Sequence, residues 1–156
     1  MFHFSKKVEF KEQLEVTRSF LESNVGAFPK YKCHLSAEFL KRTMGLEVKV
    51  GIYIPENIRI YSEQDLNIML CSGHAWNYSP EQNRDVDLTY DQFTNNSSDR
   101  IKILKVNDKS LRELSDGWIQ HMIVQNGESF KSTIDYLVDS FKKEEFKLIA
   151  NYLARH

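Results

Sequence analysis

The amino-acid sequence predicts a single α+β domain over residues 1–156. Two observations support this fold class: apolar residues recur at helical spacing near both ends of the chain, and they alternate at strand spacing in its middle. The resulting order of helix, helix, sheet and helices is typical of α+β proteins rather than of doubly wound parallel folds. At 156 residues, the chain can bury such a core without disulfides or a structural metal.

Two helices are expected first. Residues 5–23 place apolar side chains at helical spacing with Lys and Glu on the opposite side, and Ser5 has the right chemistry for an N-cap. Gly26 and Pro29 interrupt this pattern and indicate a loop. The second helix should end near Gly45. This arrangement places Cys33 at the start of the second helix.

A sheet is expected next, because the apolar period changes from helical spacing to alternation. The expected strands cover residues 48–54, 58–60, 66–71, 74–78, 85–89 and 101–106. The turn-like segment 79–83 should join two of these strands as a hairpin, and the polar segment 94–100 should be a loop. The strand at 66–71 is apolar enough to be central.

The helical period returns after Val106. Apolar residues within 111–118, 130–141 and 146–153 predict three short helices. Residues 107–156 are therefore expected to form a helical C-terminal part.

Composition restricts the partners and the location. Twenty-one Lys and Arg balance 22 Asp and Glu, so we expect neither nucleic acid nor an anionic membrane as partner. The segment from Met1 to Lys11 alternates aromatic and charged residues without a continuous apolar stretch. We therefore expect no signal peptide or membrane anchor and a cytoplasmic location, where the two cysteines should be free thiols. The sequence does not indicate an oligomeric state.

Cys33 is the first candidate for chemistry, because a helix N-terminus favours thiolate over thiol. The other cysteine, Cys71, lies in an apolar run and is interpreted as a buried hydrophobic residue. His74 and Asp87 fall on the two arms of the predicted hairpin, where an imidazole and a carboxylate on neighbouring strands can form a hydrogen bond. Asp85 shares a strand face with Asp87 and is an alternative partner for His74.

Several short motifs resemble the small transglutaminase-like members of the papain-like cysteine hydrolase superfamily. They are Phe28-Pro29, Cys33 followed by Ser36 and Leu40, Gly73-His74-Ala75-Trp76, and Asp87-Leu88-Thr89 with Gln92-Phe93. The resemblance implies a catalytic core over residues 24–93, with a helix packed against an antiparallel sheet. It also implies a catalytic triad of nucleophilic Cys33, His74 and Asp87. Two departures are that His34 stands where a small residue is expected and that no upstream oxyanion donor can be identified.

The first functional hypothesis is therefore a thiol-dependent acyl-transfer enzyme that acts on an amide or ester bond. Peptidase, amidase, deamidase and transamidase reactions share this first step. We expect a peptide or protein substrate and no cofactor. The alternative is a catalytically inert papain-like module that binds another protein.

A zinc site formed by Cys33, His34, Cys71 and His74 is a weaker hypothesis. Neighbouring residues, and residues three apart on a strand, point in different directions, whereas zinc requires tetrahedral ligands.

Overall fold

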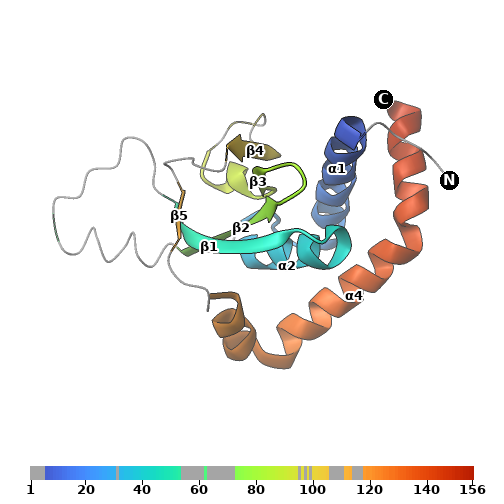
Figure 1. Cartoon of the computed structure of the whole chain (residues 1–156). Coiled ribbons are helices and arrows are strands. Elements are labelled where there is room, and N and C mark those ends of the chain that lie inside the picture. The colour runs from blue at the N-terminus through green and yellow to red at the C-terminus, as the bar shows by residue number, and fades with distance from the viewer. Residues whose placement is uncertain are drawn as a thin grey trace.

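The computed structural model describes residues 6–30, 32–53, 62, 73–94, 96, 98, 100–105, 111–113 and 118–156. Within these ranges the chain forms α-helices, antiparallel strands and 3-10 helical turns, which confirms the predicted α+β class (Figure 1). In chain order the elements are α1 (Lys6–Asn24), α2 (Cys33–Met44), β1 (Glu47–Tyr53), β2 (Gly73–Ser79), β3 (Arg84–Asp87), η1 (Tyr90–Gln92), β4 (Lys102–Lys105), β5 (Leu111–Glu113) and α4 (Trp118–Arg155).

The described strands form one sheet in the order β4-β3-β2-β1-β5. Every neighbouring pair is antiparallel, and β2 is the central strand. The predicted hairpin is present: residues 80–83 form the turn between β2 and β3, and Tyr78 lies opposite Asp85. Asn83 adopts a positive φ of 52° in this turn, a conformation that asparagine tolerates better than most residues. Leu88 and Thr89, which were predicted to continue the strand, turn away from it instead.

Helix α2 packs on one face of the sheet, against β2 and β1. Cys33 and Ala37 on the helix form a small apolar cluster with Val50 of β1 and Ala75 of β2. Beside this cluster, Asn77 Nδ2 of β2 donates a 2.9 Å hydrogen bond to the carbonyl oxygen of Ala37. Because Asn77 is almost completely buried, this bond satisfies a polar group that would otherwise be costly to bury. These contacts fix the N-terminal half of α2 over the centre of the sheet.

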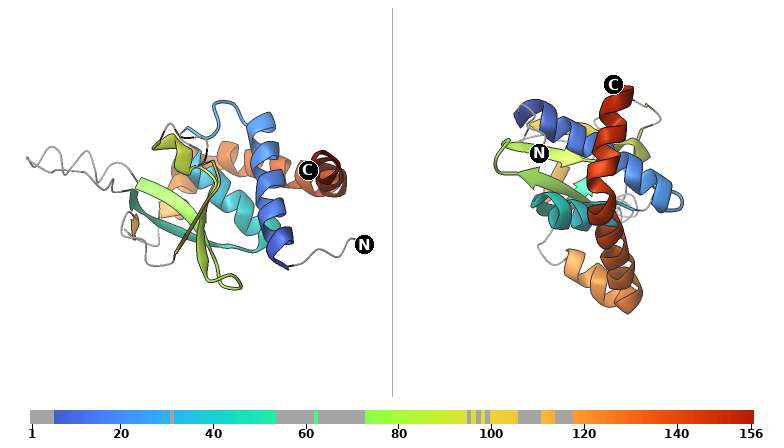
Figure 2. Two further views of the ribbon diagram at one scale, coloured as in Figure 1. Left: turned by 90° about the horizontal axis from the view of Figure 1, so that it is seen from above. Right: turned by 90° about the vertical axis from the view of Figure 1, so that its right-hand side faces the viewer.

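The main core lies where α1, α2 and α4 meet. Phe20 of α1, Phe39 of α2 and Phe141 of α4 contact one another, with ring centroids 5.1 to 5.7 Å apart. All three rings are buried, and burying aromatic side chains is the largest apolar contribution available to a core. Figure 2 shows the C-terminal half of α4 beside α1. The last helix therefore completes the core to which α1 and α2 contribute.

The structure corrects the prediction of three short helices after Val106. Residues Leu111–Glu113, expected at the start of a helix, form β5 and pair with β1, with Gly51 opposite Glu113. Pairing with the outer edge of β1 satisfies backbone groups there and overrides the local helical spacing. The C-terminal part is therefore not wholly helical.

The predicted helices at 130–141 and 146–153 are parts of one 38-residue helix, α4. The residues between them are Lys142, Lys143, Glu144 and Glu145, which all favour helix and include no glycine or proline. Helix α4 curves along its length and so contacts both α2 and α1 (Figure 1).

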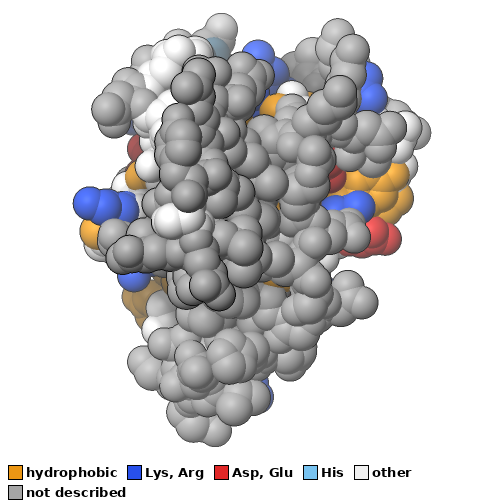
Figure 3. Space-filling model, turned by 90° about the vertical axis from the view of Figure 1, so that its left-hand side faces the viewer, with side chains coloured by type: hydrophobic (Ala, Val, Ile, Leu, Met, Phe, Trp, Pro, Cys, Tyr) orange, Lys and Arg blue, Asp and Glu red, His pale blue; other side chains and the backbone are white. Residues whose placement is uncertain are grey.

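Some expectations fall outside the described residues: the strands at 58–60 and 66–71, Cys71, and the Ser5 N-cap. Among the described residues, no helix contains an apolar stretch of the length that crossing a bilayer requires. On the described part of the face in Figure 3, side chains of Lys and Arg are interspersed with those of Asp and Glu and form no single patch.

Candidate active site

Helix α2 begins at Cys33, as the sequence predicts. Its N-cap, Lys32, makes no side-chain capping bond, and the first helical hydrogen bond runs from the Ser36 N–H to the Lys32 carbonyl oxygen at 2.9 Å. The N–H groups of the first turn therefore have no partner within the helix and point past its end. This end of the helix carries the positive end of the macrodipole, which favours a thiolate at Cys33.

Strands β2 and β3 bring His74 and Asp87 together. His74 Nε2 lies 2.5 Å from Asp87 Oδ2, and the two side chains are 0% and 1% exposed. The carboxylate that contacts His74 is therefore Asp87, and not Asp85, which lies opposite Tyr78 and Leu104 further along β3. The other ring nitrogen of His74, Nδ1, is buried and has no nitrogen or oxygen partner among the described residues.

Asp87 is held in place by the turn that follows it. Its Oδ1 accepts hydrogen bonds from the Thr89 backbone N–H at 2.9 Å and from the Thr89 hydroxyl at 3.0 Å. Gln92 Nε2 in turn donates to the Thr89 hydroxyl oxygen at 3.2 Å. An aspartate that binds the backbone two residues on is a common turn-forming arrangement. Because Oδ1 is used in this turn, Oδ2 is directed at His74.

Arg18 of α1 fixes the same segment from the other side. It donates to the carbonyl oxygen of Leu88, the residue directly after Asp87, and to that of Arg100 at 3.0 Å. Both of its terminal nitrogens bind the Asp91 carboxylate at 2.9 Å, and its Nε binds Glu22 at 2.6 Å. The side chain is only 3% exposed. A buried guanidinium with all these bonds holds the chain after Asp87 against α1.

Sequence reasoning did not identify Arg18. Arginine on an amphipathic helix is normally exposed, so its residue type alone gave no signal of burial. The nearest signal was Asp91, which follows the Asp87-Leu88-Thr89 motif and supplies the matching carboxylate.

Two aromatic rings enclose the imidazole of His74. The Trp76 ring is parallel to it at a centroid distance of 6.0 Å, and the Phe93 ring meets it edge to face at 4.8 Å. These rings give apolar surroundings to His74, which is completely buried. A low-dielectric surrounding of this kind strengthens the interaction between His74 and Asp87.

The surroundings of Cys33 favour its ionised form. Burial by itself would raise the pKa of the Cys33 thiol, but this effect is outweighed by hydrogen bonds to His34 and His74, the charge of His74 and the backbone N–H of Ala75. Together these interactions lower the pKa of Cys33 to about 6. Of the three candidate residues Cys33 is also the most exposed, at 8%.

The pKa of His74 shifts in the opposite direction to that of Cys33. Burial would lower its pKa, but the charge and hydrogen bond of Asp87, with a further contribution from Cys33, raise the pKa of His74 to about 10. The lowered pKa of the thiol and the raised pKa of the imidazole together favour a thiolate beside an imidazolium. This is the ionisation state that a nucleophilic cysteine requires.

His34 is a second imidazole at the thiol that sequence reasoning did not assign to the site. Its side chain is one of the causes that lower the pKa of Cys33, and its ring packs at 5.1 Å on that of Phe130 from α4. The sequence showed His34 as an unexpected residue after the nucleophile and as a candidate zinc ligand, and the contact with Phe130 joins residues too distant in the chain to be inferred.

Cys71, one of the four residues of the predicted zinc site, lies outside the described residues. Within the described ranges, no cluster of three or more His, Cys, Asp or Glu side chains is arranged to hold a metal ion.

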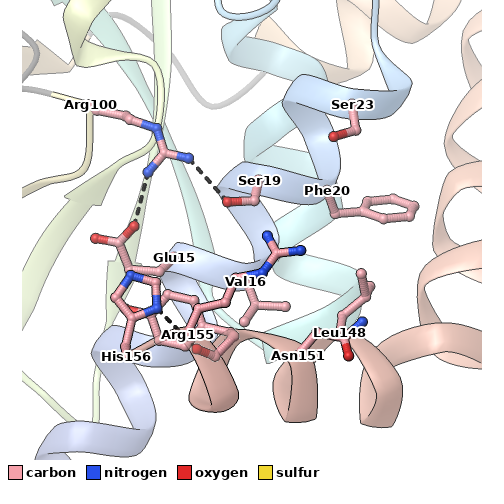
Figure 4. A pocket seen from close by; sticks show the side chains of 11 residues that line it. Glu15, Val16, Ser19, Phe20, Ser23, Arg100, Leu148, Asn151, Arg155 and His156 are labelled. Carbon is pink, nitrogen blue, oxygen red and sulfur yellow. Dashed lines mark hydrogen bonds and ion pairs between the residues drawn. The ribbon is translucent and has the colours of Figure 1, made fainter.

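A separate pocket lies between α1 and the C-terminal end of α4 (Figure 4). At its rim Arg100 donates to Glu15 at 2.9 Å and to Ser19 at 3.1 Å. Its lining includes none of Cys33, His74 and Asp87. The pocket is therefore not the candidate site.

Comparisons of this chain with protein-family models, with curated proteins and with solved structures each found no match. The geometry itself defines the class: an α+β protein in which a helix-start cysteine, a buried histidine and a buried aspartate adjoin one another. In chemical terms the arrangement offers a nucleophile, a proton carrier and a group that orients the carrier.

Proposed function

We propose that this chain is a thiol-dependent acyl-transfer enzyme of the papain-like, transglutaminase-like kind, with Cys33, His74 and Asp87 as its catalytic triad. The observation that carries the proposal is the buried His74–Asp87 pair beside the first residue of α2. A helix that bears the cysteine and packs on an antiparallel sheet that bears the other two residues is what the family resemblance implies.

In the first half-reaction the Cys33 thiolate attacks the carbonyl carbon of an amide or ester. A C–S bond forms, and the carbonyl π electrons move to oxygen. His74, as imidazolium, gives its Nδ1 proton to the leaving nitrogen or oxygen as the bond to carbon breaks. The product is a thioester on Cys33 and a neutral His74 that is still bonded to Asp87 through Nε2.

In the second half-reaction neutral His74 accepts a proton at Nδ1 from water or from an amine. The resulting nucleophile attacks the thioester carbon, the C–S bond breaks, and Cys33 leaves as thiolate beside the imidazolium. Water gives hydrolysis or deamidation, and an amine gives transamidation. Asp87 keeps the ring in one orientation through both steps.

A peptide or protein is the proposed substrate, because these supply the amide groups on which such a triad acts.

The proposal is tested first by the reactivity of Cys33. Iodoacetamide alkylation of Cys33, followed by mass spectrometry across pH, should show a midpoint near the thiol pKa of about 6. His74→Ala should move this midpoint upward, because the hydrogen bond and the charge of His74 both lower the pKa of Cys33.

Acylation is tested with p-nitrophenyl acetate. The wild-type protein should release a burst of p-nitrophenolate, and Cys33→Ala should release none. If Cys33 alkylates like an ordinary thiol with a pKa of about 8.5, and no Cys33-dependent burst occurs, the enzyme proposal fails. That result would favour the inert protein-binding module.

A further inference from the structure

Arg18 lies between the two segments that carry the proposed catalytic residues. It belongs to α1, outside residues 24–93, and its side chain is only 3% exposed. On one side its guanidinium carbon lies 4.9 Å from the ring centroid of Phe28, in the loop that leads to Cys33. On the other side its N–H groups bind the chain that follows Asp87. One buried side chain therefore contacts both segments.

We propose that Arg18 is a positioning residue for acyl transfer, which holds the turn after Asp87 and the loop before Cys33 in one arrangement. This inference rests on the proposed acyl-transfer function. It assigns Arg18 a role that acts through Asp87 and not by contact with the substrate.

The turn after Asp87 is bound to Arg18 at both of its ends. Nη1 of Arg18 donates to the carbonyl oxygen of Leu88, the next residue in the chain, so this bond acts directly beside Asp87. At the other end, Nη1 and Nη2 each donate to one carboxylate oxygen of Asp91 at 2.9 Å. The Asp87 Oδ2 atom at the start of this turn lies 2.5 Å from His74 Nε2. A shift of the turn would therefore displace the carboxylate from the imidazole.

The chemistry of arginine suits this position. A planar guanidinium can bind a carboxylate through two N–H groups and can also stack on an aromatic ring, whereas lysine has neither the fork nor the flat face. The contacts of Arg18 with Asp91 and Phe28 use both properties. Helix α1 packs against α4 in the main core, so the guanidinium projects from a fixed element.

The position of Asp87 matters for the reaction, because a displacement of about 1 Å at a catalytic group can slow a reaction about 100-fold. A displaced Asp87 would also lose part of the charge interaction and hydrogen bond that raise the pKa of His74. A positioning role thus predicts two linked effects, slower acylation and a lower pKa of His74. A role in stability alone predicts neither effect in the folded protein.

Arg18→Lys keeps the positive charge but removes the two-pronged bond and the stacking. In the full chain it should slow the burst of p-nitrophenolate from p-nitrophenyl acetate about 10-fold per folded molecule. NMR titration should place the pKa of His74 below its wild-type value of about 10. Asp91→Asn leaves Arg18 in place, weakens its bond to the turn and should change both quantities in the same direction. This second variant tests the inference even if Arg18→Lys does not fold.

Arg42→Lys is the matched control. Arg42 is in α2, the helix that begins with Cys33, and it also pairs with two carboxylates, those of Glu38 and Asp135. Neither carboxylate belongs to the turn after Asp87 or to the loop before Cys33. The control variant should therefore keep the acylation rate and the His74 titration of the wild type.

Unchanged acylation and an unchanged His74 pKa in the folded Arg18 and Asp91 variants would overturn the inference. A change in only one of these quantities would also overturn it, because the position of Asp87 links them. Equal effects in Arg42→Lys would do the same, since the loss of any arginine pair would then suffice. A wild type that acylates no faster than Cys33→Ala would mean instead that the proposed function has failed, and the inference that rests on it would fail too.

Discussion

His74 Nε2 and Asp87 Oδ2 lie 2.5 Å apart, although 13 positions separate the two residues in the chain. Both side chains are almost completely excluded from solvent. An ionised carboxylate at this depth requires a partner, and a buried imidazole remains charged only beside an opposite charge. Asp87 therefore favours the charged form of His74.

The first prediction concerns Asp87→Asn. Without the carboxylate charge, burial dominates, so the pKa of His74 should fall well below its value of about 10. NMR titration of the His74 ring protons measures this shift. The stability lost in this variant also depends on pH. Because folding raises the pKa of His74, its pairing with Asp87 stabilises the protein fully below the unfolded-state pKa of 6.5. This stabilisation disappears as the pH rises through the folded-state pKa of about 10. The stability difference between wild type and variant should shrink over that range.

Asp85→Asn is the matched control for this prediction. Asp85 is on the same strand and is also buried, but Asp87 is the carboxylate that bonds His74. The His74 titration should stay close to that of the wild type. A similar fall in the His74 pKa in both variants would contradict the specific pairing.

The second prediction concerns Arg18→Leu. This change leaves the carbonyl oxygens of Leu88 and Arg100 and the carboxylate of Asp91 without their shared donor. Removing one partner of a buried charged network typically costs about 3–5 kcal/mol, so urea unfolding should show a loss of that order. Arg18→Lys keeps the charge but cannot make the two-pronged bond to Asp91, and an intermediate loss is expected. A loss below about 1 kcal/mol for Arg18→Leu would show that the network contributes little.

The third prediction tests whether α4 is part of the core. Ile134 is 1% exposed, and Ile134→Ala should destabilise the protein by about 2–5 kcal/mol. Tyr136, two positions further on the same helix, is 69% exposed, and Tyr136→Ala should change stability by less than about 0.5 kcal/mol. Thermal or urea unfolding of both variants checks this contrast. Equal effects would mean that α4 does not pack as described.

The fourth prediction concerns the end of α2. Gly45 has a φ of 69°, and its N–H bonds to the Lys41 carbonyl oxygen. A Cβ at Gly45 would meet no atom within 4 Å, so only the backbone conformation opposes Gly45→Ala, at a cost of about 1 kcal/mol. Gly26→Ala, where there is likewise space and no positive φ, should be close to neutral in the same unfolding measurement.

The sequence predicted the elements that local patterns determine. The alternation of apolar residues and the turn-like segment indicated the β2–β3 hairpin, and the loop before Cys33 indicated where α2 begins. Together they placed His74 next to Asp87. This pattern did not distinguish Asp85 from Asp87, because both residues lie on one face of β3. In the structure Thr89 distinguishes them, because it binds Oδ1 of Asp87.

The features that the sequence did not predict depend on contacts between distant segments. Burial of Arg18 requires Leu88, Asp91 and Arg100 to converge on α1. The strand at Leu111–Glu113 forms only because β1 offers an edge to pair with. The approach of Phe130 to His34 depends on the course of α4, and residue spacing alone carries no information about that course.

The contact between His34 and Phe130 also has a consequence for biosynthesis. A nascent chain that has emerged only as far as the end of β5 already contains Cys33, His74 and Asp87, but it lacks the ring against which His34 packs. His34, the residue after the reactive thiol, thus acquires this packing partner only after α4 has been made.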